Sequence, residues 1–188
     1  KIEKEKKVIL KEINMVTDDP RMHQWILFQK NLFEKHPAKN PTYGNAKAVK
    51  SINRNIINNY YDKHYLPNNM VISIVGNVNN IKEKINKYFG SLKPKNLKQR
   101  KRVKEPLQTK IKTFVEKRKT YNSYMVLGYK TVSRMHKDSY VFDVINSILG
   151  RGQSGWIFEE IRNKHGLAYQ VGVQNELEDD YGAFAVFA

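Results

Sequence analysis

The chain has 188 residues, 40% of them hydrophobic, with no cysteine and a formal net charge of +16. This length suffices for one large domain or two small ones. The absence of cysteine excludes disulfides and cysteine-based catalysis, so any metal must be bound by His, Asp or Glu. The positive charge would suit nucleic acid, yet the basic residues are dispersed, and the dense run 93–104 is explained equally well by a solvated connector.

The N-terminal segment predicts an amphipathic helix with two carboxylates on one face. Seven positions turn a helix through about 700°, which leaves Glu5 and Glu12 within about 20° of each other. They could form half of a metal site, or they could lie on the solvated face and pair with lysines three and four positions away. The apolar stripe of this helix consists of Val8, Ile9, Ile13 and Val16.

Two further helices and a loop are expected next. Asp18 and Asp19 before Pro20 indicate a helix start, and an apolar face at helical spacing continues to Phe33. Residues 36–44 are punctuated by proline and glycine and predict a loop. Ser51 can cap a helix that ends near His64.

Residues 70–75 form a continuous apolar run of β-branched character, which predicts a buried central strand. Asn79 then opens a helix that Gly90 closes at the C′ position. Helix, strand and helix together indicate one α+β layer pair.

A second α+β unit is expected beyond the connector. Residues 110–117 and 123–132 alternate like paired strands, and Asp138 begins a helix. A glycine-containing loop at 150–155 leads into another helix. Two strands, at 167–173 and 182–187, follow on either side of an acidic turn at 176–180. The predicted segments are therefore 1–95, the basic linker 96–109, and 110–188.

No apolar stretch approaches the ~20 residues that span a bilayer, and no secretory signal is recognisable, so we expect a cytoplasmic protein that does not enter membranes. The chain starts at Lys1 and stops inside the apolar run 181–188, so we expect it to be part of a longer polypeptide.

Four segments, taken in order, resemble the insulinase or pitrilysin family of zinc metallopeptidases, which includes mitochondrial processing peptidase and bacterial two-domain relatives. They are EKEKKVILKEI at 3–13, YYDKHYLPNNMVISIVGNV at 60–78, KYFGSL at 87–92 and GWIFEEIRNKHGLAYQV at 155–171. The resemblance implies an α+β fold of two tandem α/β-sandwich domains in a clamshell, both incomplete here. Residues 1–95 would be the C-terminal part of the first, zinc-bearing domain, and 110–188 the start of the second.

The resemblance also implies a zinc site. In the family, two histidines of an H-x-x-E-H helix and a glutamate about seventy residues downstream bind the ion. Glu12 matches the downstream ligand, and Glu5 matches a nearby carboxylate that orients ligands or a zinc-bound water. None of the five histidines has the H-x-x-E-H spacing. The motif would therefore lie upstream of Lys1, and this segment alone should be inactive.

Arg162 and Tyr169 match an arginine and a tyrosine that, in the family, hold the substrate carbonyl and stabilise the oxyanion. From the residues alone, Arg162 could instead sit at a helix end and Tyr169 in the core. The loop 150–155 resembles the position of a substrate-contacting glycine-rich loop, but with only three glycines an ordinary turn is favoured.

The predicted function is therefore part of a zinc endopeptidase that hydrolyses peptides or small unfolded proteins in a closed chamber. Its partners would be a peptide substrate and either the second half of the same chain or the other subunit of a homodimer or heterodimer. A non-catalytic scaffold or regulatory subunit of the same family is the alternative. A basic nucleic-acid-binding module is a weaker third interpretation, because no clustered aromatic and basic motif supports it, and we expect no nucleic acid partner.

Overall fold

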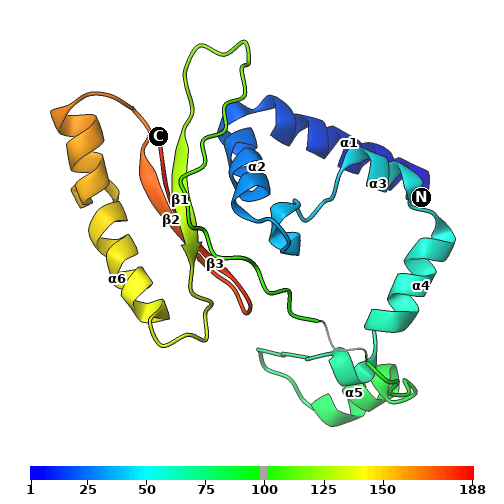
Figure 1. Cartoon of the computed structure of the whole chain (residues 1–188). Coiled ribbons are helices and arrows are strands. Elements are labelled where there is room, and N and C mark those ends of the chain that lie inside the picture. Colours follow the sequence, from blue (N-terminus) through cyan, green and yellow to red (C-terminus); the bar gives the residue numbers. More distant parts are fainter. Residues whose placement is uncertain (98–100) are drawn as a thin grey trace. The chain divides into compact units, whose positions relative to one another are not determined.

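The structure, a computed structural model, describes residues 1–97 and 101–188 (Figure 1). Contacts group the chain into two compact units, one of Lys1–Val8 with Ala46–Lys101 and the other of Ile9–Asn45 with Arg102–Ala188. Both kinds of secondary structure are present, which confirms the α+β class. The contact units place 9–45 with the C-terminal part, whereas the boundaries 1–95, 96–109 and 110–188 stay a prediction. Residues 98–100 of the predicted linker lie outside the described residues.

The described residues contain six α-helices, three strands, three short 3₁₀ helices and one π-helix. The α-helices are α1 (Ile2–Asp18), α2 (Pro20–Leu32), α3 (Ala46–Ser51), α4 (Arg54–His64), α5 (Ile81–Phe89) and α6 (Ser139–Gly150). The 3₁₀ helices are η1 (Pro37–Lys39), η2 (Pro67–Asn69) and η3 (Gly152–Ser154), and the π-helix is η4 (Phe158–Lys164). The strands are β1 (Val126–Thr131), β2 (Gly172–Leu177) and β3 (Gly182–Phe187).

A local signal accounts for the start of α2, and a contact within the first unit holds the start of α1. The Asp19 carboxylate accepts a hydrogen bond of 2.8 Å from the amide of Arg21, and Pro20 occupies the first helical position, as the sequence predicts. In the first unit, the Lys6 ammonium of α1 binds the Glu3 carboxylate at 2.9 Å and the Ile52 carbonyl at 3.1 Å. These contacts fasten the start of α1 to the chain between α3 and α4.

The cap predicted at Ser51 is wrong, because Ser51 ends α3 and donates its hydroxyl to the Ala48 carbonyl. The helix that follows is capped two residues later, where the Asn53 side chain accepts from the amide of Ile56 at 3.0 Å. Both residue types make good caps, and the break between α3 and α4 decides which one is used. The predicted end near His64 is confirmed.

The buried strand predicted at 70–75 is also wrong. None of the described strands pairs with this segment, and the side chains of Val71 and Val75 are both 97% exposed. A segment forms a β-strand only where a neighbouring segment exchanges backbone hydrogen bonds with it. The helix predicted from Asn79 is present as α5, with Gly90 as its C-cap in a right-handed conformation rather than a left-handed C′ glycine.

The sheet of the second unit is antiparallel with the strand order β1-β3-β2. Its centre, β3, spans the residues predicted for it, 182–187. Ala185 lies opposite Gly128 on one side and Gln174 on the other. The strand predicted at 123–132 is present in part as β1. Its predicted partner at 110–117 is not a strand: β1 pairs with β3 on one edge, and no described strand pairs with its other edge. The strand predicted at 167–173 begins only at Gly172.

Helices α2 and α6 belong to the same unit as the sheet and lie on its two sides (Figure 1). Because successive side chains of a strand point to opposite faces, alternate residues of β3 face one helix or the other. On the α2 side, Phe187 meets the Trp25 ring at 5.4 Å between centroids, and Ala183 packs in a buried cluster with Leu32 and Phe33. On the α6 side, the ring of Phe184 lies 6.5 Å from that of Phe142. The core of this unit therefore depends on one central strand.

A single carboxylate fixes the irregular chain after α2. Glu105 accepts hydrogen bonds from the backbone amides of Glu34, Lys35 and His36 at 2.6 to 2.9 Å, and from the Lys130 ammonium at 2.8 Å. Burial would raise the pKa of the Glu105 carboxyl, but these donors outweigh burial and lower the pKa to about 2. Glu105 thereby joins the end of α2 to strand β1.

Candidate functional site

Arg162 lies on a π-helix, an uncommon element in proteins. Residues 158–164 are wound as η4, and at its end the His165 amide reaches back five residues to the Glu160 carbonyl at 3.3 Å. The chain then turns at Gly166, whose φ of 59° suits glycine. Single turns of π-helix occur often at functional sites because they redirect side chains.

The structure brings Arg162 and Tyr169 together. The guanidinium carbon of Arg162 lies 4.2 Å from the centroid of the Tyr169 ring and 4.8 Å from that of Phe158. These distances are within the range of cation–π contacts. The Tyr169 side chain is 83% exposed, so the alternative that it fills the core is wrong. Both side chains are accessible to a ligand from solvent.

The charge of Arg162 is not neutralised within the part of the chain that the structure describes. The neighbouring Glu160 binds Lys164 at 2.9 Å and His165 at 3.4 Å, and the hydrogen bond from Lys164 lowers the pKa of the Glu160 carboxyl. Glu159 accepts from the Asn163 amide at 2.6 Å. Because both acidic neighbours have other partners, the guanidinium keeps N–H donors for a ligand.

The loop 150–155 is shaped by packing. A Cβ at Gly150 would collide with the Val173 side chain, and one at Gly155 would lie 2.6 Å from the Leu149 carbonyl oxygen. Gly152 has a φ of 51° and open space around its Cα. Steric contacts and one left-handed residue explain all three glycines, so their number does not by itself indicate a ligand.

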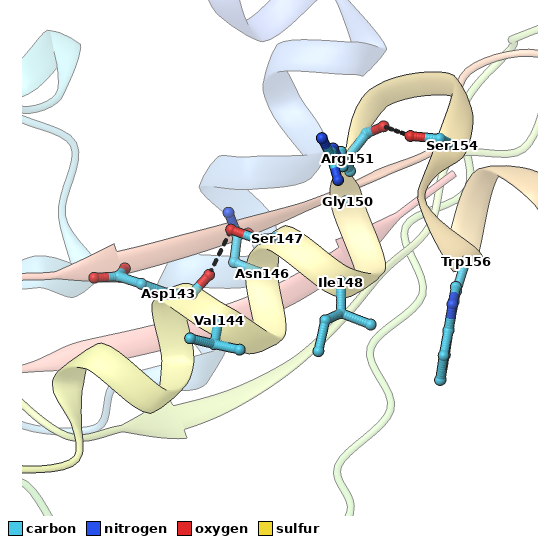
Figure 2. Close-up of a pocket in the computed structure, with 9 residues that line it drawn as sticks. All are labelled: Asp143, Val144, Asn146, Ser147, Ile148, Gly150, Arg151, Ser154 and Trp156. Atoms are coloured by element: carbon cyan, nitrogen blue, oxygen red, sulfur yellow. Dashed lines mark hydrogen bonds between the residues drawn. The ribbon is translucent and has the colours of Figure 1, made fainter.

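An open depression of about 910 Å³ lies along α6 and this loop. Figure 2 shows the residues that line it. Three of its polar side chains have partners: Ser147 donates to the Asp143 carbonyl at 2.9 Å, Ser154 donates to the Arg151 carbonyl at 3.0 Å, and the Asp143 carboxylate accepts from Asn175 at 3.0 Å. The buried side-chain oxygen of Asn146, which also lines the depression, accepts no hydrogen bond from the described residues. A smaller cavity of about 190 Å³ lies between the loop and the start of β2. Phe158, whose ring contacts Arg162, lines this smaller cavity.

Glu5 and Glu12 both lie on α1, and both are exposed. Neither has an ion pair or a hydrogen bond to another described side chain, so the lysine pairs of the solvated-face alternative are absent there. No group of three or more His, Asp or Glu side chains among the described residues could hold a metal ion. Glu12 could supply one carboxylate ligand, but these residues do not complete a zinc site.

Sequence reasoning missed a buried polar cluster around His36, which it had treated as a surface or loop residue. The His36 side chain is 1% exposed, its Nδ1 accepts from the Ala38 amide at 3.1 Å, and its Nε2 lies 3.3 Å from Asp180. Next to it, Tyr181 donates to Glu176 at 2.6 Å, and burial followed by this carboxylate raises the Tyr181 pKa. Since the partners are about 140 residues apart, no local pattern could have identified the cluster.

Residues 51–188 match the family model described as the peptidase M16 inactive domain. The chain belongs to the peptidase M16 family. This confirms the family that the sequence resembles. Arg162 and Tyr169 lie within the matched residues, whereas Glu5 and Glu12 precede them.

Curated relatives of this M16 chain are named uncharacterised zinc proteases. One from Bacillus subtilis is 30% identical over 188 residues, which is 99% of this chain and 45% of the relative. One from Mycobacterium leprae is 28% identical over 191 residues, which is 100% of this chain and 43% of the relative. The chain thus spans less than half the length of these relatives.

Among solved structures, a protease from Helicobacter pylori superposes on this M16 chain with a TM-score of 0.90 at 28% identity. The match covers 100% of this chain and 47% of that one. A peptidase M16 inactive domain from Pseudomonas fluorescens shares the fold, with a TM-score of 0.76 at 21% identity, over 99% of this chain and 45% of that one. None of the helices in residues 1–97 and 101–188 is both long and apolar enough to cross a bilayer.

Proposed function

We propose that this chain is part of an M16 zinc endopeptidase in which Arg162 and Tyr169 bind the substrate carbonyl and Glu12 supplies one metal ligand. The observation that carries the proposal is the contact between Arg162 and Tyr169, with a guanidinium that no described carboxylate neutralises. The names of the curated relatives support zinc protease activity for the longer protein.

Arginine and tyrosine suit the task of holding a carbonyl whose oxygen becomes negative. A guanidinium presents several N–H donors in one plane, and its charge persists at any physiological pH. The Tyr169 hydroxyl is a second donor on an exposed side chain. Donors placed where negative charge develops stabilise the transition state more than the ground state.

The proposed metal ligand is Glu12, whose exposed carboxylate is free to bind a cation. Zinc accepts carboxylate oxygen together with imidazole nitrogen, and it would supply Lewis acidity in the complete site. Its remaining ligands would come from an H-x-x-E-H motif outside this sequence. Glu5, on the same face of α1, would orient those ligands or a water.

The substrate arm of the proposal is tested with Arg162→Ala in the full-length protein. We expect kcat for a fluorogenic peptide to fall about 100-fold, the usual loss of one oxyanion donor, with bound zinc unchanged. Arg134→Ala is the control, because it removes a guanidinium that is exposed and that binds the Glu178 carboxylate and the Leu177 carbonyl. Wild-type kinetics for Arg162→Ala would exclude a substrate role.

The metal arm is tested with Glu12→Gln, which should remove both bound zinc and peptide hydrolysis. Glu3→Gln is the control, since Glu3 lies on the same helix and pairs with Lys6. Glu5→Gln should weaken zinc binding about 10-fold to 100-fold without abolishing it. Full zinc content and turnover for Glu12→Gln would rule out the ligand assignment.

A non-catalytic scaffold or regulatory subunit is the second candidate, favoured by the description of the matched region as an inactive domain. It predicts a full-length protein that binds peptide without hydrolysing it. A peptide substrate, a partner half in the same chain or in a second subunit, and a cytoplasmic location belong to the leading proposal. Turnover assays on the isolated protein and on its mixture with a partner separate the two candidates.

A further inference from the structure

Phe158 and Arg162 are four positions apart on η4, so their side chains project from neighbouring turns of one short element. The Arg162 guanidinium lies 4.8 Å from the Phe158 centroid and 4.2 Å from the Tyr169 centroid. Tyr169 is itself a candidate donor to substrate. Phe158 has no polar group, so its contact with Arg162 can only be stacking.

We propose that Phe158 is a positioning residue that holds the Arg162 guanidinium in the orientation needed for the substrate carbonyl. This inference rests on the proposed function and adds a residue to it. Phe158 is partly buried, so part of its ring packs against the fold and is supported there. A supported ring is a fixed surface for a side chain that would otherwise have four freely rotating bonds.

The charges around Arg162 support the same role. An exposed arginine on a helix ordinarily pairs with an acidic side chain three or four positions away. Here Glu159 and Glu160 are bound to Asn163 and to Lys164 with His165, so neither pulls the guanidinium off the ring. A ring face attracts the cation without occupying its N–H groups, which point outward in the guanidinium plane. Stacking therefore orients Arg162 and leaves its donors free.

The stacking is tested directly in the full-length protein labelled with ¹⁵N-arginine. The Nε–H resonance of Arg162, identified by its loss in Arg162→Lys, should shift in Phe158→Leu because the ring current is removed. Phe158→Tyr should restore a wild-type position. Phe114→Leu is the control, since Phe114 is 51% exposed and takes part in none of the cation–π contacts found among the described residues. An unchanged Arg162 resonance in Phe158→Leu would overturn the inference.

Kinetics test the function of the stacking. Phe158→Leu should lower kcat about 10-fold with a smaller change in KM, because a misplaced donor costs transition-state binding. Phe158→Tyr should recover most of kcat, and Arg162→Lys, which keeps the charge but not the plane, should resemble Arg162→Ala. Equal kcat for Phe158→Leu and wild type would refute the positioning role. If Phe158→Leu folds poorly, full activity of Arg162→Lys would refute it instead.

The two proposals fail in different ways. If Arg162→Ala turns over like wild type, the proposed function is overturned and the positioning role falls with it. If Arg162→Ala is impaired while Phe158→Leu is normal in kcat, only the role of Phe158 is refuted.

Discussion

Two apolar runs of the chain, 70–75 and 182–187, have the composition of buried strands, yet only the second becomes one. The second run is β3, paired on both sides, and Phe184 at its centre is 3% exposed. In the first run, Val71 and Val75 are 97% exposed, and no described strand lies beside them. The comparison teaches that a β-branched run specifies a strand only together with neighbours that pair with it.

The strongest way to break this comparison is to shorten one side chain in each run of the 188-residue chain. Phe184→Ala should lower the free energy of unfolding by about 4 kcal/mol, because it leaves a cavity between α6 and the sheet. Val75→Ala should change it by less than about 0.5 kcal/mol, since that side chain is already in water. Urea titration followed by circular dichroism measures both. Similar losses of unfolding free energy in Phe184→Ala and Val75→Ala would contradict the conclusion that only 182–187 is a buried strand.

A second test asks whether irregular backbone can be held as firmly as a paired strand. Glu105→Gln should lower the free energy of unfolding by about 2 kcal/mol, because three amides and Lys130 lose an ionised acceptor. Glu83→Gln is the control on an exposed helix. An unchanged free energy of unfolding for Glu105→Gln would mean that the turn after α2 is stable without the Glu105 carboxylate.

The same carboxylate predicts a pH dependence. The Glu105 pKa in the folded chain, about 2, lies below its ordinary value of 4.5. The contact therefore stabilises the fold fully above about pH 4.5, and this contribution is lost as the pH falls toward 2. Unfolding midpoints measured across that range should fall more steeply for the wild type than for Glu105→Gln. Parallel curves would argue against the contact.

The smallest expected effect concerns α4, in the unit that contains 70–75, because the Asn53 side chain caps this helix. Asn53→Ala should cost about 1 kcal/mol, the usual value of a helix cap, whereas Ser51→Ala should be nearly neutral. Thermal unfolding of the two variants provides the measurement. A larger loss for Ser51→Ala than for Asn53→Ala would support the helix cap at Ser51 that the sequence predicts.

These contrasts explain how much of the fold could be predicted. Helix starts depend on nearby residues, so Asp19 with Pro20 marked α2 correctly, and β3 was located at its full length. The prediction of a strand at 110–117 is wrong although its alternation fits an edge strand, because the segment does not pair with the free edge of β1. Pairing partners are chosen in three dimensions and leave little trace in a local window.

The candidate site divides in the same way. Arg162 and Tyr169 are seven residues apart, so a single motif pointed to both, and the structure brings them into contact. Glu105 acts on amides about 70 residues away, and His36 meets Asp180 from the other end of the chain. Neither contact has a spacing that sequence reasoning could detect. The role of Glu12 stays a prediction, because its proposed co-ligands lie outside this sequence.

The loop 150–155 has a consequence for redesign. A saturation library across it should return only glycine at 150 and 155, where backbone or Val173 fills the space of a methyl group. At position 152 asparagine should also survive selection for folding, because it tolerates left-handed torsions. Sequence changes in the loop 150–155 should therefore be made at Arg151 and Gln153, and Gly150 and Gly155 should be kept.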